Sequence, residues 1–352
     1  MHTGKKIYDK ITKFIKLSAI WVIKILFAPR HFKVNIFKST WYAIVGGFMP
    51  DQVALYNLNM KNRHEYLSEF DWYKSRYINE PYNFILNNKL VCTDILKQYV
   101  KVAEIIVVKQ KGKITSADNK VKDYEDIIAE IKKRGYAFIK PNNMGKGSGV
   151  LRFTYENDKF YIDSEETTEE ELLKLLKKRN DYHICEGIKQ SKYLNKLYDK
   201  TTNTIRMVTL RNPNTNEFEV YSAVQRIGTK ETIPVDNGSR GGLTAKIDIN
   251  TGILTSAKCI QRTVDFDIHP DSNNPIKGVK IPNWNKIKKE MLELANKFPY
   301  LYFVAWDILL TDEGICIIEA NTSSGVNILQ LWGGERQKGL GEFYRAHKII
   351  KK

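Results

Sequence analysis

The segment from Trp306 to Asn321 constrains the fold of this chain most, because it combines strong strand signals with acidic side chains. Two apolar runs, WDILL and GICIIEAN, flank a short polar turn and predict a β-hairpin. Glu319 and Asn321 are two positions apart and so point to the same face of their strand. If residues 312–314 form the loop, Asp307 stands opposite Glu319, whereas a slip of one residue separates the two carboxylates.

Carboxylates that face one another among Ile, Leu, Val and Cys repel each other and lose hydration. A divalent cation removes both penalties, and Asp307, Glu319 and Asn321 offer the oxygen ligands that Mg²⁺ prefers. The hairpin therefore contains a candidate magnesium site. The alternative is that one acidic side chain faces water and binds nothing.

A glycine-rich turn, FIKPNNMGKGSGV, follows a second apolar strand signal that ends at Lys140. Its glycines leave backbone N–H groups free to approach phosphate oxygens, and lysine ammoniums can pair with them. The candidate phosphate contacts are Lys140, Gly145, Lys146, Gly147 and Ser148. An ordinary hairpin turn is the alternative, and the turn is not a Walker motif because no G-K-[ST] and no helix signal follow.

Three arginines lie in positions where they could meet an anion. Arg206 and Arg226 stand mid-strand among apolar neighbours, and Arg240 lies in the flexible turn NGSRGG. An edge-strand arginine that reaches solvent explains any one of them. Three converging guanidiniums would instead bind an anionic substrate or a transferring phosphoryl group bidentately.

Helix and strand signals alternate from Lys89 onward, which predicts an α+β fold. Strands are expected at 104–109, 136–140, 150–155 and 182–188, with helices at 121–135 and after the capping box of Thr168 and Glu171. Beyond Ile188 the chain becomes strand-rich, with one clear helix from about 285 to 298. We therefore expect a smaller lobe at 89–187 and a larger lobe at 188–345, followed by a basic tail at 346–352, with the ligand in the crevice between the lobes.

The first 88 residues precede this pattern. Residues 1–28 form a basic amphipathic helix, with Ile7, Ile11, Phe14, Trp21 and Ile25 on one face, and residues 29–88 are an aromatic-rich helical region with no readable chemistry. Lysines interrupt the apolar run, so it is too short to span a membrane. The helix either lies in an anionic membrane surface or packs on its own domain or a partner subunit.

The net charge of +16 favours anionic partners such as nucleotides, acidic sugars or lipid headgroups. No nucleic-acid-binding motif accompanies it, so nucleic acid is not an expected partner. The four cysteines are far apart in sequence and are expected to be reduced core residues.

An ordered set of motifs resembles the ATP-grasp superfamily over about residues 89–330. In chain order these are the lysine-ended strand, the glycine turn, the linker strand with Glu186, the arginine strands, the N-x-x-R-G-G turn and the D…E-x-N hairpin. The run DFDIHPDSNNPIKGVKIPNW, followed by a helix and AWDILL, is similar to its sugar-transfer-associated and teichuronopeptide-type families. The resemblance implies two α+β lobes that clasp ATP, preceded by the helical extension.

The resemblance also assigns roles to individual residues, with ATP and Mg²⁺ as cofactors. It implies that Lys140 and either Lys109 or Lys89 hold the phosphates, residues 142–149 form a flap, and Glu186 and Ile188 line the adenine pocket. It places magnesium on Asp307, Glu319 and Asn321, and the phosphoryl group and carboxylate on Arg206, Arg226 and Arg240. His269 belongs to the family's HPD run and either caps a turn or takes part in catalysis.

The implied activity is that of an ATP-dependent carboxylate-amine ligase that forms an amide through an acyl phosphate, in bacterial surface-polysaccharide (capsule or teichuronic-type) assembly. Its partners would be a small-molecule or glycan carboxylate and an amine, in the cytoplasm or at the inner face of the cell membrane. An ATP-grasp kinase for a sugar or related molecule and a non-catalytic polysaccharide-binding scaffold are the alternatives.

Overall fold

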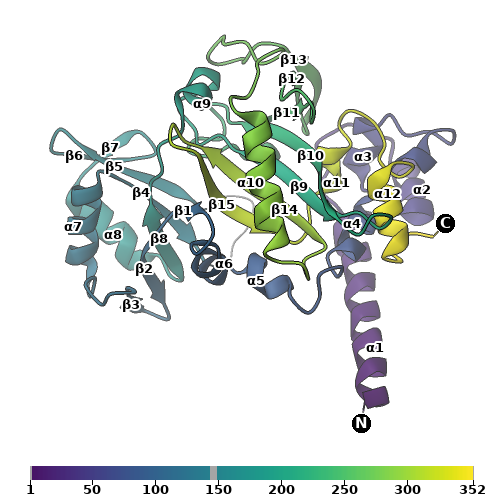
Figure 1. The fold of residues 1–352 in the computed structure, drawn as a ribbon, viewed down its shortest axis with the longest axis horizontal. Helices are drawn as coiled ribbons and strands as arrows, with labels where there is room; N and C mark the ends of the chain where they lie inside the picture. The colour runs from purple at the N-terminus through teal and green to yellow at the C-terminus, as the bar shows by residue number, and fades with distance from the viewer. Residues whose placement is uncertain (1, 143–148, 352) are drawn as a thin grey trace.

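The computed structural model describes residues 2–142 and 149–351 and contains two β-sheets and an N-terminal helical region (Figure 1). This arrangement confirms the predicted α+β class. The larger sheet has eight strands in the order β1-β15-β14-β9-β10-β11-β12-β13, and the smaller has seven in the order β3-β2-β8-β4-β5-β6-β7.

The larger sheet is antiparallel except where β1 runs parallel to β15. Helix α10 (Trp284–Asn296) lies across it and buries Trp284, Ile287 and Met291 in its core (Figure 1). Its strands are β1 (Lys101–Val102), β9 (Ile205–Arg211), β10 (Phe218–Ile227), β11 (Leu243–Ile247), β12 (Leu254–Cys259), β13 (Arg262–Phe266), β14 (Phe303–Leu310) and β15 (Ile315–Asn321).

The smaller sheet is antiparallel throughout and packs against α7 (Tyr124–Arg134) and α8 (Glu169–Lys178) (Figure 1). Helix α7 begins later than expected because Asp123 caps it, and it ends as predicted at Gly135, whose φ is 71°. The predicted capping box of Thr168 and Glu171 is present. The strands are β2 (Ile105–Gln110), β3 (Lys113–Thr115), β4 (Tyr136–Pro141), β5 (Leu151–Glu156), β6 (Lys159–Ile162), β7 (Glu165–Thr167) and β8 (Tyr182–Glu186).

The predicted division at residues 187 and 188 falls between β8 and β9, and hence between the two sheets. The smaller sheet itself begins later than residue 89. Helix α6 (Lys89–Leu96) packs into the core of the larger lobe, and β1 extends the larger sheet.

The N-terminal helical region is joined to the C-terminal end of the chain. Asn79 Nδ2 donates to the carbonyl oxygen of Phe303 at 2.6 Å, and the backbone N–H of Phe303 donates to Asn79 Oδ1 at 3.2 Å. Ile350, expected in a free basic tail, is buried in the same cluster as Leu67 and Phe343. The remaining elements are α2 (Ile36–Gly46), α3 (Pro50–Leu55), η2 (Arg63–Glu65), α4 (Glu69–Ser75), α5 (Asn83–Asn87), α9 (Lys192–Leu197), η3 (Gly238–Arg240), α11 (Val326–Leu329) and α12 (Gly339–Ala346).

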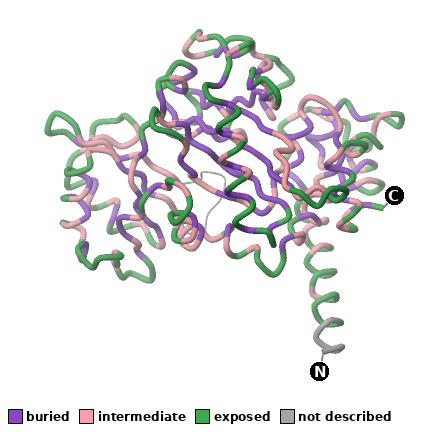
Figure 2. Tube along the Cα trace, in the orientation of Figure 1, coloured by how far each residue is buried: buried purple, intermediate pink, exposed green. Residues whose placement is uncertain are grey.

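The first helix, α1 (His2–Ile20), continues into a π-helical segment, η1 (Trp21–Leu26). Helix α1 projects from the body, and most of its described residues are exposed (Figures 1 and 2). Ile25 is buried because η1 packs against α2 and α4, whereas Ile7 lies on the projecting part of α1 and is exposed. No helix in the described part of the chain is long and apolar enough to cross a bilayer.

The C-terminal hairpin pairs Asp307 with Glu319 as predicted, but by a different route. Leu310 pairs with Ile315, so the loop has four residues, 311–314. A bulge then shifts the register between Asp307 and Ile308 and brings the two carboxylate positions opposite each other. All four cysteines are free and buried, as expected for core residues.

Candidate active site

A cavity of about 640 Å³ is lined by residues of both sheets, the segment after β8 and the N-terminal helical region. Most of the site residues predicted from sequence line it. They are Lys140, Glu186, Ile188, Arg206, Arg226, Asp307, Glu319 and Asn321. The fold thus brings the ends of β4 and β8 in the smaller sheet together with four strands of the larger one, β9, β10, β14 and β15.

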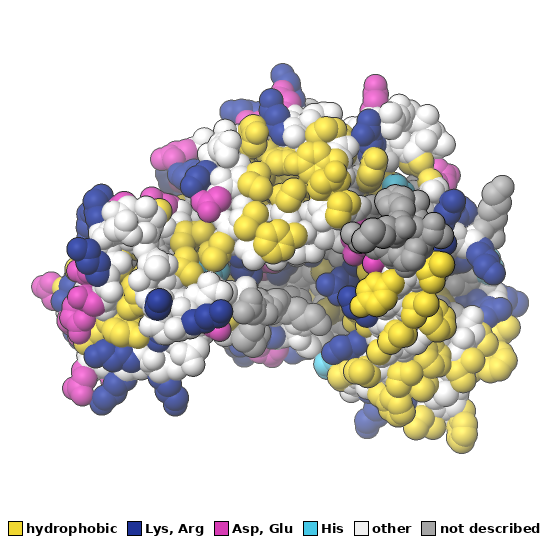
Figure 3. All heavy atoms as spheres, turned by 90° about the horizontal axis from the view of Figure 1, so that it is seen from below, with side chains coloured by type: hydrophobic (Ala, Val, Ile, Leu, Met, Phe, Trp, Pro, Cys, Tyr) yellow, Lys and Arg dark blue, Asp and Glu magenta, His cyan; other side chains and the backbone are white. Residues whose placement is uncertain are grey.

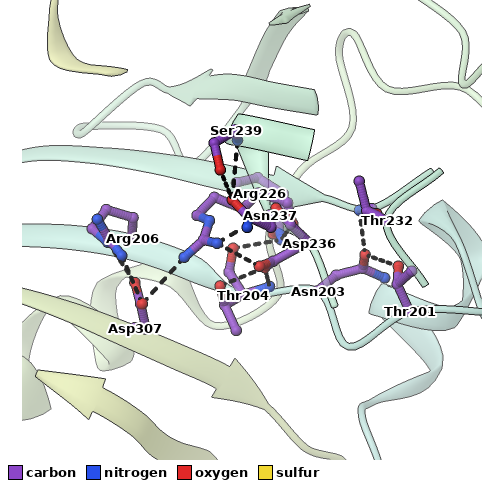
Figure 4. A network of polar contacts seen from close by, with 12 residues as sticks. Thr201, Asn203, Thr204, Arg206, Arg226, Thr232, Asp236, Asn237, Ser239 and Asp307 are labelled. Carbon is purple, nitrogen blue, oxygen red and sulfur yellow. Dashed lines mark hydrogen bonds and ion pairs between the residues drawn. The ribbon is translucent and has the colours of Figure 1, made fainter. Parts of the chain in front are cut away.

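Asp307 is the centre of a buried charge network (Figure 4). Arg206 Nε donates to Asp307 Oδ1 at 2.5 Å and Arg206 Nη2 to Oδ2 at 2.7 Å, while Arg226 Nη1 donates to Oδ2 at 3.1 Å. Burial alone raises the pKa of Asp307, but the two guanidiniums outweigh it and hold the pKa below its usual value. Both oxygens of this predicted metal ligand are therefore bonded to arginine.

A second carboxylate completes the network. Asp236 Oδ1 lies 2.7 Å from Arg226 Nη2, and its Oδ2 accepts hydrogen bonds from the backbone N–H and the hydroxyl of Thr204. Two arginines and two aspartates make the network neutral, so none of these buried charges lacks a counter-charge. The network holds Arg206 and Arg226 at the cavity wall with fixed orientations (Figure 4).

Two lysines face the cavity near the smaller sheet. Lys89, at the start of α6, donates to the carbonyl oxygen of Pro141 at 3.3 Å, and Lys140 lies over the ring of Phe138 at 6.0 Å. The pKa of Lys89 is lower than usual, mainly because the ammonium is buried. The charge of Lys140 lowers this pKa further, and the carboxylate of Glu319 offsets part of the shift. This part of the cavity therefore favours a ligand that carries several negative charges.

His183 lies beside the two lysines, and its Nδ1 is 2.9 Å from Asn142 Oδ1. Burial, followed by the charges of Lys140 and Lys89, lowers its pKa to about 3. The imidazole is therefore neutral at physiological pH and adds no charge to the lysine pair.

Lys109, expected as a phosphate contact, does not line the cavity. Its side chain is 2% exposed, and its ammonium donates to the carbonyl oxygens of Leu176, Lys177 and Arg179 at 3.1, 2.9 and 2.7 Å. These are carbonyls at the end of α8, which lack helical partners and attract a cation. The expectation for Lys109 was wrong, and Lys89, its alternative, is the lysine beside Lys140.

Arg240 also lies outside the cavity. It is exposed in η3, and its charge acts on Asp163 of the smaller lobe. Of the three guanidiniums expected to converge on an anion, those of Arg206 and Arg226 line the cavity. The predicted phosphate contacts Gly145, Lys146, Gly147 and Ser148 lie outside the described residues.

Within residues 2–142 and 149–351, no group of three or more His, Cys, Asp and Glu side chains is placed to hold a metal ion. Glu319 and Asn321 line the cavity beside Asp307, so two carboxylates and one amide are the oxygen ligands available on the hairpin.

Residues 70–342 match a protein family described as sugar-transfer associated ATP-grasp. The chain belongs to this family. The match covers well over half of the chain, and it confirms the resemblance and the ATP-grasp class of enzyme expected from the sequence. No curated protein matches this ATP-grasp chain.

Solved structures with a similar arrangement share little sequence with this ATP-grasp chain. One is N5-carboxyaminoimidazole ribonucleotide synthetase from Thermotoga maritima, which is 11% identical with a TM-score of 0.35 over 68% of this chain and 42% of that chain. The ATP-grasp ligase PsnB, complexed with precursor peptide PsnA2 and AMPPNP, is 11% identical with a TM-score of 0.36 over 70% and 54%. D-alanine–D-alanine ligase from Bacillus anthracis is 11% identical with a TM-score of 0.39 over 75% and 66%. The chain covers less than two thirds of each.

Sequence reasoning missed part of the site of this ATP-grasp protein. Helix α4 contributes Glu69, Trp72 and Tyr73 to the cavity wall, and Arg76 follows it there, although residues 29–88 showed no readable chemistry. Asp236 was also missed, although two arginines inside apolar strands require carboxylate partners, and Asp236 in PVDNGS lies ten residues after Arg226.

Of the two roles considered for His269, capping a turn and taking part in catalysis, the contacts favour capping a turn. His269 is buried, its Nδ1 accepts the backbone N–H groups of Asp271 and Ser272 at 3.2 Å, and its Nε2 lies 2.8 Å from the carbonyl oxygen of Gly228. It does not line the cavity, so it caps the turn after Pro270.

The depressed pKa of His183 predicts a pH-dependent stability. Because the folded-state pKa is about 3 and the unfolded value is about 6.5, the stabilisation is present above pH 6.5 and is lost as the pH falls towards 3. Between pH 7 and 5 this group lowers the free energy of unfolding by about 2 kcal/mol. Urea unfolding should show this slope weakened in His183→Gln and kept in His64→Gln, whose side chain is exposed. Equal slopes in both variants would contradict the assignment.

Proposed function

We propose that this protein is an ATP-dependent carboxylate-amine ligase that forms an amide through an acyl phosphate. One observation carries the proposal: Lys89 and Lys140 line the same cavity as the oxygen ligands Glu319 and Asn321 and the arginines held by Asp307. Cations for phosphate, oxygens for a metal and guanidiniums for a reacting anion are the groups that phosphoryl transfer to a carboxylate requires.

In this proposal the nucleotide occupies the part of the cavity next to the smaller sheet. Glu186 is the last residue of β8, and Ile188 lies two residues after it. The two residues would line the adenine pocket, where Ile188 adds a buried apolar side chain. Lys140 and Lys89 would hold the phosphates. Residues 142–149 would cover them as a flap.

The residues present fit magnesium bound together with a nucleotide. Magnesium is usually held by one or two carboxylates together with substrate phosphates, so a cluster of three acidic side chains is not required. Glu319 and Asn321 would hold the ion, and Asp307 would join them by exchanging its longer contact, the one with Arg226, for the cation. The ion would neutralise charge on the phosphoryl oxygens.

The reaction then has two steps. A carboxylate oxygen of the substrate attacks the γ-phosphorus, the bond to the bridging oxygen breaks, and ADP leaves with the electron pair. A neutral amine next attacks the acyl carbon, and phosphate and one proton are released as the amide forms. Arg206 and Arg226 would stabilise the charge on the transferring group, and neither step requires a general base if the amine arrives neutral.

The family is described as sugar-transfer associated, which supports a role of this enzyme in bacterial surface-polysaccharide assembly, of the capsule or teichuronic type, as part of the proposal. We infer that the carboxylate belongs to a uronic acid or an amino acid and that the enzyme works at the inner face of the cell membrane. An acidic glycan fits the basic charge of the chain.

The test is an ADP-release screen against pools of uronic acids and amino acids, with the products identified by mass. A ligase releases ADP only when carboxylate and amine are both present, and it yields an amide. ADP release without an amine, together with a stable phosphorylated product, would show a kinase instead. Binding of ATP without ADP release from any pool of surface precursors would show a non-catalytic binding protein.

A further inference from the structure

The first 50 residues carry an unusual share of the charge. They contain nine Lys or Arg residues and one acidic residue, Asp9, and so contribute +8 to the net charge of +16. One seventh of the chain thus supplies half of its net charge. An anionic partner at this end of the molecule is the simplest explanation.

The same segment carries most of the exposed hydrophobic side chains of the described chain. Of the 22 large hydrophobic residues that are exposed, 13 lie in or beside α1, η1 and α2. We call them the N-terminal apolar surface: Ile7, Tyr8, Ile11, Phe14, Ile15, Val22, Ile23, Phe27, Ile36, Phe37, Trp41, Ile44 and Val45.

Hydrophobic side chains gather together when the molecule is seen from the side towards which α1 projects, and Lys and Arg side chains lie around them (Figure 3). Phe37 is 82% exposed and Phe14 is 71% exposed. Monomeric proteins seldom expose apolar surface of this extent unless it binds something.

This surface is fixed to the body of the protein. Ile25 of η1 is fully buried, and η1 lies against α2 and α4. The ammonium of Lys13 sits 4.1 Å from the ring centroid of Tyr77. Its position relative to the cavity is therefore defined by packing.

The net positive charge of the N-terminal segment distinguishes between two candidate partners, a second copy of the chain and an anionic bilayer. A second copy of the chain would bring another N-terminal segment of net charge +8 close to the first, and the two segments would repel. An anionic bilayer attracts each Lys or Arg near it by about 1 kcal/mol, and it accepts exposed Phe, Trp and Ile side chains between its headgroups. We propose that the N-terminal apolar surface docks the protein on an anionic lipid bilayer.

The docked elements also form part of the cavity wall. Lys24 of η1 lines the cavity together with Trp72 of α4 and Arg76, which follows α4. Docking would therefore place this part of the cavity wall near the bilayer. If the proposed ligase activity holds, its carboxylate substrate is an acidic glycan carried on a membrane lipid and presented at the bilayer surface.

The test measures binding of the full chain to phosphatidylcholine vesicles with and without phosphatidylglycerol, by flotation. Wild type should bind the anionic vesicles, and the double variant Phe14→Glu/Phe37→Glu should bind roughly tenfold less or not at all. Val264→Glu, at an exposed apolar position of β13, should bind like wild type.

Equal vesicle binding by the double variant and wild type would overturn the proposal. So would a wild type that ignores anionic vesicles and forms a dimer that the double variant does not form. ATP-analogue binding without vesicles is measured on the same preparations. Normal nucleotide affinity with no vesicle binding rejects the docking surface alone, whereas vesicle binding without nucleotide affinity rejects only the proposed ligase.

Discussion

Glu319→Gln should lower substrate-dependent ADP release by roughly 100-fold or more. The substitution keeps the size of the side chain and one of its oxygens, but it removes the charge that a divalent cation requires. Glu319 lines the cavity and lies opposite Asp307 in the hairpin, so no other side chain of β15 can take its position. The coupled ADP-release assay with the substrate pair found in the screen measures the effect.

The matched control is Glu313→Gln in the same hairpin. Glu313 is exposed and its Oε2 lies 3.1 Å from Lys101 Nζ, a surface pair worth at most about 1 kcal/mol. We expect wild-type ADP release from it. If Glu319→Gln releases ADP as fast as Glu313→Gln does, Glu319 does not hold the catalytic cation.

Arg226→Met should lower the free energy of unfolding by about 3–5 kcal/mol. The guanidinium connects two buried carboxylates, Asp236 at 2.7 Å and Asp307 at 3.1 Å. Its removal leaves Asp307 paired with Arg206 alone and takes away the ion pair of Asp236. Urea unfolding monitored by tryptophan fluorescence measures the loss.

Two further variants test the cause of this loss. Arg262→Met breaks an exposed pair with Glu231 and should change stability by less than about 1 kcal/mol. Arg226→Met/Asp236→Asn removes one positive and one negative charge and should regain part of the stability lost in Arg226→Met. If Arg226→Met unfolds like Arg262→Met, the network does not stabilise the fold.

Local patterns predicted the helices and strands well, because each depended on neighbours in sequence. Gly135 ends α7 and Thr168 caps α8 through contacts within a few residues. The pairing of Asp307 with Glu319 was predicted from a three-residue loop, whereas the structure reaches it through a longer loop and a bulge. A bulge depends on how the strand fits its sheet, which no local pattern reveals.

The parts of the site that sequence missed depend on distant contacts. Lys109 and Lys89 were both candidates by position. The C-terminal end of α8, whose carbonyl oxygens accept hydrogen bonds from Lys109, lies about 70 residues away in sequence. Lys109 meets these carbonyls only in the folded chain. Helix α4 reaches the cavity because the N-terminal region packs on the far end of the chain, as in the pairing of Asn79 with Phe303 across 224 residues.

In the proposed function the cavity binds a magnesium nucleotide, with Lys140 and Lys89 on its phosphates. Isothermal titration with a non-hydrolysable ATP analogue and Mg²⁺ measures this binding. We expect saturable one-to-one binding to wild type and to Lys101→Met, whose ammonium is exposed, and an affinity roughly tenfold or more weaker in Lys140→Met and in Lys89→Met. Unchanged affinity in both cavity variants, or no saturable binding to wild type, would contradict it.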